Sequence, residues 1–314
     1  MLRNVLIISD GGLVLFSKEF FNTVSQPRLV GSLLTAILEF STNNVGAPVS
    51  YLEFSTIAVS ICSSKGPEDA KLMLERPSTA SSGSASPAPP HLSRHKSEFH
   101  NPVERHETPS ATPKQTPRRS GGGSLICALF HDVEDGPELG RLIAVELLSS
   151  FRRQFGASLA KVGGGTPHIN LNDFEPFHAT IPVVLQGLVA PVLEGLMRVN
   201  GIKMSLLLSD DSRILHCTAD GVDGLGLGAN LEALSNLSED AMGAYNDVFR
   251  SAVISGRGST RLHIFRLPYA QATLVVQSCR STRPRDFLKP VAETVRMCVK
   301  LFKLMDNLNL LTDM

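Results

Sequence analysis

The sequence predicts an α/β protein of the α+β type, with two related modules, each a five-stranded sheet of the antiparallel type flanked by helices. Residues 2–21 read as a β-hairpin, because two apolar, β-rich runs are joined by an Asp-Gly turn at 10–12. The second half of the chain repeats this pattern over residues 202–219, where Ser209-Asp210 falls on Ser9-Asp10. We therefore expect two modules that each open with a hairpin.

Length and charge limit the classes of function. The 314 residues suffice for two ordinary domains, and 30 basic residues balance 30 acidic ones. A neutral chain without a stripe of basic and aromatic residues lacks the electrostatic footprint of a nucleic-acid binder. The five cysteines lie singly in apolar runs, so they indicate buried thiols in a reducing compartment rather than zinc ligands or disulfides.

Membrane and secretion signals are weak. The apolar run at the N-terminus is too short for a signal peptide and is interrupted by Asp10. The longest apolar tract, residues 181–197, contains Gln186, Pro191 and Glu194, which favours a buried helix over a membrane span. We expect a soluble cytosolic protein that reaches membranes only through partners.

The first module continues with a helix and two strands. Ser25-Gln26-Pro27 opens a helix that ends by residues 43–46. Its apolar positions are expected to form one face against the sheet: Leu29, Val30, Leu33, Leu34, Ile37 and Leu38. Residues 49–54 and 56–62 then read as two closely joined strands.

Residues 63–124 differ abruptly in composition, with hardly an aliphatic side chain after Leu74. Such a segment cannot bury enough apolar surface to offset its ordering entropy, so disorder is predicted. It is either an arm controlled by phosphorylation or a neutral surface insertion. The candidate phosphorylation sites are Ser86, Ser97, Thr108, Thr112, Thr116 and Ser120.

Order returns at residues 125–130, which we interpret as the fifth strand of the first sheet. A helix over 135–155 and another over about 175–199 close the module, so the domains are 1–200, with the insertion inside, and 201–314. The second module is predicted from similar patterns as a hairpin at 202–219, a glycine-rich bend at 221–228, a helix at 231–244, strands at 248–254, 262–267 and 272–279, and a helix at 285–308.

The last helix is more apolar than one buried face requires. Its first stripe comprises Leu288, Val291, Val295, Cys298, Phe302 and Met305. A second stripe includes Leu301, Leu304 and Leu308, which we expect to bind a partner subunit or to face the first module of the same chain. A helix wholly buried in its own domain is the alternative.

Residues 1–200 resemble the longin fold of adaptor and transport-complex small subunits. The resemblance rests on residues 3–7 and 12–20 of the hairpin, on 138–156 ending in Phe-Arg-Arg-Gln-Phe-Gly, and on 172–175. Residues 202–314 resemble a roadblock (dynein light chain seven) domain or a second longin. The resemblance implies binding of small GTPases of the Rab, Arf or Rag type, and of other longin or roadblock subunits, at endomembranes. It implies no catalytic residue.

Candidates for chemistry are few. Glycines 224, 226 and 228 could cradle a phosphate, but neither a third glycine at dinucleotide spacing nor a P-loop lysine accompanies them, which favours a flexible turn. His131-Asp132 with Glu134-Asp135 lacks a nucleophile elbow. His216 and His263 lie within strands and read as structural. Arg152-Arg153 either complement the helix dipole or contact an acidic partner or lipid headgroup.

The sequence therefore predicts a non-enzymatic adaptor or scaffold subunit of a membrane-trafficking or small-GTPase-regulating complex, without cofactor or metal. One alternative is a subunit of a guanine-nucleotide exchange complex, whose activity belongs to a composite surface. The other is a nucleotide-binding or hydrolytic enzyme that uses the glycine turn and His131.

Overall fold

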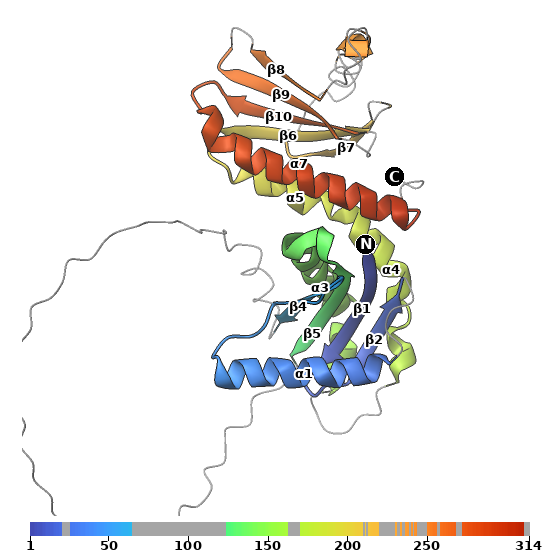
Figure 1. Cartoon of the computed structure of the whole chain (residues 1–314). Coiled ribbons are helices and arrows are strands. Elements are labelled where there is room, and N and C mark those ends of the chain that lie inside the picture. The colour runs from blue at the N-terminus through green and yellow to red at the C-terminus, as the bar shows by residue number, and fades with distance from the viewer. Residues whose placement is uncertain are drawn as a thin grey trace, which may run out of the picture.

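A computed structural model describes most of the two predicted modules (Figure 1). The described residues are 1–20, 26–64, 124–162, 170–209, 211, 213–219, 230, 233, 236–238, 240, 242–243, 250–255, 258–267 and 272–310. The opening hairpin is confirmed as strands β1 (Leu2–Ser9) and β2 (Val14–Glu19). Of the two turn glycines, Gly12 has the positive φ, 80°, and lies near Thr35.

The first sheet has five antiparallel strands in the order β2-β1-β5-β4-β3. Strands β3 (Tyr51–Glu53), β4 (Ile57–Ser64) and β5 (Leu125–Asp132) complete it. The prediction that residues 125–130 supply the fifth strand is confirmed, since Ser64 on β4 lies opposite Leu125 on β5. The six candidate phosphorylation sites between these strands lie outside the described residues.

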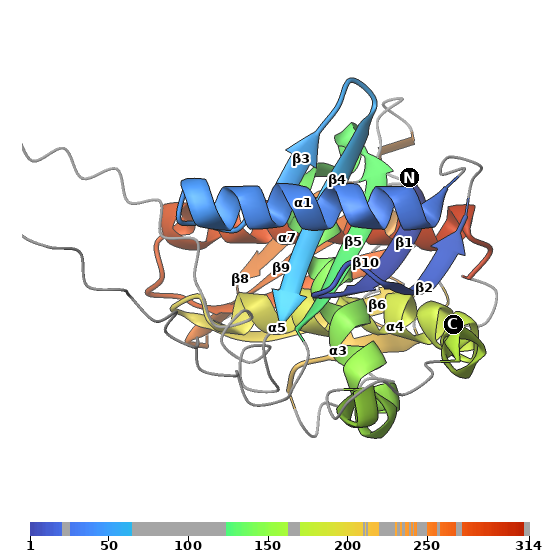
Figure 2. The ribbon, with the colours of Figure 1, turned by 90° about the horizontal axis from the view of Figure 1, so that it is seen from below.

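Helices cover both faces of this sheet (Figure 2). Helix α1 (Pro27–Asn44) packs on one face through Leu34 and Leu38. The other face is covered by α3 (Gly136–Val162), which buries Ile143 and Phe151. This helix runs past Gly156, where the prediction ended it, because a glycine within a helix costs only about 1 kcal/mol.

The predicted helix 175–199 is wrong, because it consists of two helices, α4 (Phe177–Gly187) and α5 (Val189–Met197), preceded by the 3-10 turn η2 (Leu171–Phe174). The break lies where Pro191 cannot donate to the carbonyl of Gly187, four residues earlier. Residues 171–197 contain an 18-residue window that is apolar enough by composition to cross a membrane, with a mean hydropathy of 1.6. Their buried side chains, however, join the core.

Helix α4 packs on α3, whereas α5 packs on the second sheet and on the last helix. Packing thus places α5 with the second module, although the predicted boundary at residue 200 left it with the first. A boundary drawn at residue 200 separates α5 from the sheet that it covers.

The second sheet repeats the first, with the antiparallel order β7-β6-β10-β9-β8. Its elements are β6 (Ile202–Ser209), β7 (Ile214–Cys217), β8 (Ser251–Ser255), β9 (Thr260–Leu267), β10 (Ala272–Cys279) and the helix α7 (Pro284–Asn307). The described residues between 230 and 243 are helical, as predicted for 231–244. Two modules of one design are thereby confirmed.

Each module contains a buried histidine–serine pair under its long helix. In the first, Nε2 of His131 on β5 lies 2.9 Å from Oγ of Ser60 on β4. In the second, Nε2 of His263 on β9 lies 2.9 Å from Oγ of Ser278 on β10. Because β9 and β10 occupy the places of β4 and β5, the two residue types have exchanged strands.

One apolar core joins the modules. It contains Phe151 of α3 together with Leu301 and Leu304 of α7, which are 0% and 6% exposed. The first predicted stripe of α7 is wrong at its start. Leu288 was predicted to be buried and is 46% exposed, whereas the preceding residue, Phe287, is buried. The two modules therefore pack as one body through α3, α5 and α7.

Candidate functional site: a groove along the edge strand β2

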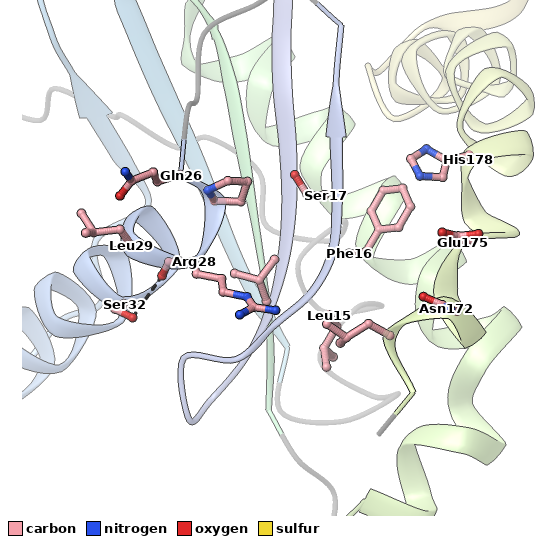
Figure 3. A pocket seen from close by; sticks show the side chains of 13 residues that line it. Leu15, Phe16, Ser17, Gln26, Arg28, Leu29, Ser32, Asn172, Glu175 and His178 are labelled. Atoms are coloured by element: carbon pink, nitrogen blue, oxygen red, sulfur yellow. Dashed lines mark hydrogen bonds between the residues drawn. The ribbon is translucent and has the colours of Figure 1, made fainter. Parts of the chain in front are cut away.

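A groove of about 910 Å³ runs along β2, between α1 on one side and η2 with α4 on the other (Figure 3). Its floor is Val14 to Ser17 of β2, which is an edge strand. Among the described strands β2 pairs with β1 alone. The groove thus combines an open sheet edge with two helical walls.

The floor is held in place by a β-bulge and an aromatic cluster. Ile7 and Ile8 lie opposite Phe16 and Val14, so Leu15 is the extra residue of the bulge. Leu15 and Phe16 are therefore both buried in the same core. The ring of Phe16 packs edge-on against Phe177 at 5.1 Å, which ties the floor to α4.

The first wall is the N-terminal part of α1, whose residues in the groove are Gln26, Pro27, Arg28, Leu29 and Ser32. Gly31 allows this wall to lie close to the strand, because a Cβ there would stand 2.7 Å from Cγ2 of Val14. Pro27 occupies the first turn, where its missing N–H costs nothing.

The second wall is η2 and the start of α4, with Leu171, Asn172, Glu175 and His178 in the groove. Asn170 caps η2 by accepting a hydrogen bond from the backbone N–H of Asn172. Phe174 anchors the wall from below through Phe151, 5.3 Å away between ring centroids.

Opposite charges line the two walls. Arg28 is exposed on α1, and Glu175 is exposed on the opposite wall. His178 lies against Phe16, at 4.6 Å between ring centroids. Partial burial and the ammonium of Lys18 lower the pKa of His178, which favours the neutral ring at pH 7. Among the residues that line the groove, Arg28 is thus the cation of the α1 wall and Glu175 the anion of the η2 wall.

The described residues hold neither a metal-binding cluster nor, at Cys62 and Cys298, an ionised thiol. No group of three histidine, cysteine or acidic side chains within the described part of the chain could hold a metal ion. Burial raises the pKa of Cys62 to about 11 and that of Cys298 to about 12, so both thiols stay protonated and poorly nucleophilic. An open strand edge and apolar walls instead suit another polypeptide.

Sequence reasoning missed the exposed apolar side of α1, because it treated this helix as having a single apolar face. Leu29 and Leu33 were predicted to lie on the sheet, which is wrong, since they are 64% and 56% exposed. The six predicted apolar positions span about half of the helix circumference at 3.6 residues per turn, more than one sheet contact needs. That width was the available signal.

The outer side of α1 exposes large apolar side chains. Leu29, Leu33 and Phe40 lie within roughly 40° of arc on the helix, and Phe40 is 66% exposed. We call these three residues the outer face of α1. It lies opposite the buried face formed by Leu34 and Leu38.

The predicted partner-binding leucines of α7 lie elsewhere. Leu301 and Leu304 are buried in the core that joins the modules, and Leu308 is half-buried against it. The stripe therefore belongs to the interior of the chain, in a core to which both modules contribute. On α3, Arg152 is half-buried and Arg153 is exposed.

The candidates for enzymatic chemistry do not meet in the groove. His131 is 1% exposed, and its ring nitrogens lie 2.9 Å from Oγ of Ser60 and 2.9 Å from the carbonyl oxygen of Asp132. A ring held in this way supports the sheet and cannot reach a substrate. The glycine turn at 224–228 lies outside the described residues.

No family model and no curated protein matches the sequence. Similar solved structures include MglB of Myxococcus xanthus, with 13% identity over 37% of this chain and 94% of that chain, and a TM-score of 0.34. The gliding protein MglB of Thermus thermophilus has 13% identity over 38% and 91%, with a TM-score of 0.35. A Roadblock/LC7 domain from Streptomyces avermitilis has 20% identity over 37% and 92%, with a TM-score of 0.29. These likenesses are weak, and the two sheets themselves define the architecture.

Proposed function

We propose that this chain is a non-enzymatic adaptor subunit that works through protein–protein surfaces in a small-GTPase-regulating or membrane-trafficking complex. The observation that carries the proposal is the outer face of α1, where three large apolar side chains are each more than half exposed on one stripe. A monomeric chain seldom exposes large apolar side chains along one stripe of a helix unless they meet a partner.

The class of partner follows from the longin and roadblock resemblance of the sequence. It suggests a small GTPase of the Rab, Arf or Rag type, or another longin or roadblock subunit, bound at the cytoplasmic side of an endomembrane. The buried position of His131 supports a structural role for that residue.

A binding experiment tests the proposal. The full chain is immobilised and exposed to purified Rab, Arf and Rag GTPases, each loaded with GDP or a GTP analogue. The variant Leu33→Glu/Phe40→Glu should weaken binding at least tenfold. The matched control Thr42→Glu/Asn43→Glu adds the same charge to exposed polar positions of α1 and should bind normally.

If both variants bind equally well, the outer face of α1 is not the interaction surface. A role in nucleotide exchange predicts a further result, namely that the chain alone is inactive in exchange and a reconstituted complex is active. A thermal shift of the purified chain with nucleotide or metal would contradict the adaptor proposal.

A further inference from the structure

The groove along β2 offers a hydrogen-bonding edge between two walls, and we propose that it binds a short extended peptide segment of a partner protein as an added strand. This inference goes beyond the proposed function, because the GTPase or longin partner is assigned to the outer face of α1. Strand addition to an open edge is a general mode of peptide recognition, in which backbone hydrogen bonds give affinity and side-chain pockets give specificity.

The register of the hairpin shows which backbone groups of β2 point into the groove. The N–H of Phe20 donates to the carbonyl of Arg3 at 2.9 Å, so these two residues form a hydrogen-bonded pair. Bonded pairs alternate along an antiparallel ladder, which makes Lys18 and Phe16 the next bonded residues. Ser17, opposite Leu6, therefore directs its N–H and C=O away from β1 and into the groove.

The walls decide between a peptide and a second copy of this chain. Residues of α1 line one side of the β2 edge, and residues of η2 and α4 line the other (Figure 3). Pairing two β2 edges from two copies would bring both pairs of walls together in the same space. A single strand without flanking helices meets no such obstacle, so the shape of the groove favours a peptide.

The side chains of the walls define the chemistry of the peptide. Alternate residues of a strand point to opposite faces, so one set would meet the α1 wall and the other the η2 wall. Each wall contributes an apolar side chain to the lining, Pro27 on one side and Leu171 on the other.

Charge distinguishes the two sets of alternate peptide residues, which we call the two phases of the peptide. Arg28 forms no ion pair with the described residues, and it stands on the α1 wall. The ligand is therefore an extended, apolar segment with an acidic residue in the phase that faces α1. Glu175 on the opposite wall disfavours acidic residues in the other phase.

The test begins with a displayed library of random nine-residue peptides, selected on the full chain and counter-selected on the variant Ser17→Pro. Proline at an outward-facing edge position removes the proposed donor and leaves the ladder to β1 intact. We expect peptides that prefer the native chain and that carry an acidic residue among alternating apolar ones. Melting curves of the variant show whether its fold is retained.

Two synthetic derivatives of an enriched peptide then test the backbone bonds. One derivative is N-methylated at the odd-numbered residues and the other at the even-numbered residues. Only the derivative whose methyl groups replace the N–H groups that face β2 should bind at least tenfold more weakly than the parent peptide. The variant Arg28→Glu should reverse the preference between the acidic peptide and its lysine analogue. The control Lys289→Glu, on α7 with an 84% exposed side chain, should behave as the native chain.

Three results would overturn the proposal. Both methylated peptides could bind as the parent does, Arg28→Glu could leave the charge preference unchanged, or selection could give no peptide that prefers the native chain over a folded Ser17→Pro variant. The variant Leu33→Glu/Phe40→Glu should bind the peptide normally, which separates this test from that of the proposed function.

Discussion

Nζ of Lys300 on α7 lies 2.6 Å from the main-chain carbonyl oxygen of Asp135, where the 3-10 turn η1 (Val133–Asp135) meets α3. The same ammonium lies 3.1 Å from the carbonyl oxygen of Glu134. Hydrogen bonds from a charged donor are stronger than neutral ones. Lys300 thus fixes the second module on the first at the rim of their common core.

Replacing Lys300 with methionine should lower the free energy of unfolding by roughly 1–2 kcal/mol, since the apolar stem remains and the charged donor is lost. The matched control is Lys303→Met, three residues later on an exposed position of α7. Urea unfolding measures both. Equal effects of the two substitutions would show that the contact with the 3-10 turn adds nothing.

The double variant Leu301→Glu/Leu304→Glu should prevent folding of the chain, because it places two carboxylates in the core that joins the modules. The control Leu288→Glu lies on the same helix at a half-exposed position and should be tolerated. Circular dichroism and gel filtration distinguish the cases. A cooperative melt of the double variant would show that these leucines lie on an outer surface that is free to bind a partner.

Gly140→Ala should destabilise the chain by roughly 1–3 kcal/mol through overpacking. A Cβ at this position of α3 would collide with Oγ of Ser60 and Nε2 of His131. Gly156→Ala, farther along the same helix, meets no atom within 4 Å and should stabilise by roughly 0.5–1 kcal/mol. Thermal melts of the two variants should therefore shift in opposite directions.

Acidification should destabilise the chain through its buried histidines. Burial lowers the pKa of His131 and that of His263, so the folded state keeps both rings neutral. An unfolded histidine titrates near about 6.5. Below that pH the unfolded chain takes up the protons first, and the stability present at pH 7 is lost as the pH falls towards the lowered folded values.

The measurement is the free energy of unfolding in urea at pH 7, 6 and 5. His131→Gln removes one titrating ring, so its stability should fall less steeply over this range than that of the native chain. His131→Gln/His263→Gln should give a shallower slope again. An unchanged slope in both variants would assign the pH dependence to other groups.

Deleting residues 77–121 should leave the melting temperature within about 5 °C of the native value, which corresponds to roughly a kcal/mol. The residues that flank the segment 65–123 are held by the first sheet, since Ser64 pairs with Leu125 and the N–H of Asp10 donates to the carbonyl of Ser124 at 3.0 Å. A larger fall would show that the deleted residues pack on the body. The closure of a shorter loop costs little.

The strands and their order along the chain were predictable in each module, because β-rich apolar runs and turn residues are local signals. Strand β10 (Ala272–Cys279) matches its predicted range, and the insertion lies between neighbouring strands as expected. The break between α4 and α5 was also readable, since Pro191 stands four residues after Gly187. The prediction noted this proline as evidence against a membrane span and did not use it to end a helix.

The candidate site was not predictable, because it depends on tertiary placement. No pattern in residues 14–17 shows that β2 lies at the edge of the sheet, or that η2 returns beside it. The partners of α7 were equally open, since an apolar stripe fits a partner subunit or another module alike. The sequence around Arg28 does not indicate that its side chain lines a groove, because that depends on the position of α1 beside β2.

The exchanged histidine and serine positions bear on how the halves of this chain should be compared. Ser60 and His131 occupy β4 and β5, whereas His263 and Ser278 occupy β9 and β10 in the opposite assignment. An alignment of the two modules would score both columns as mismatches. What the modules share is a hydrogen bond between two strands, so a search for duplicated domains should compare residue pairs as well as single residues.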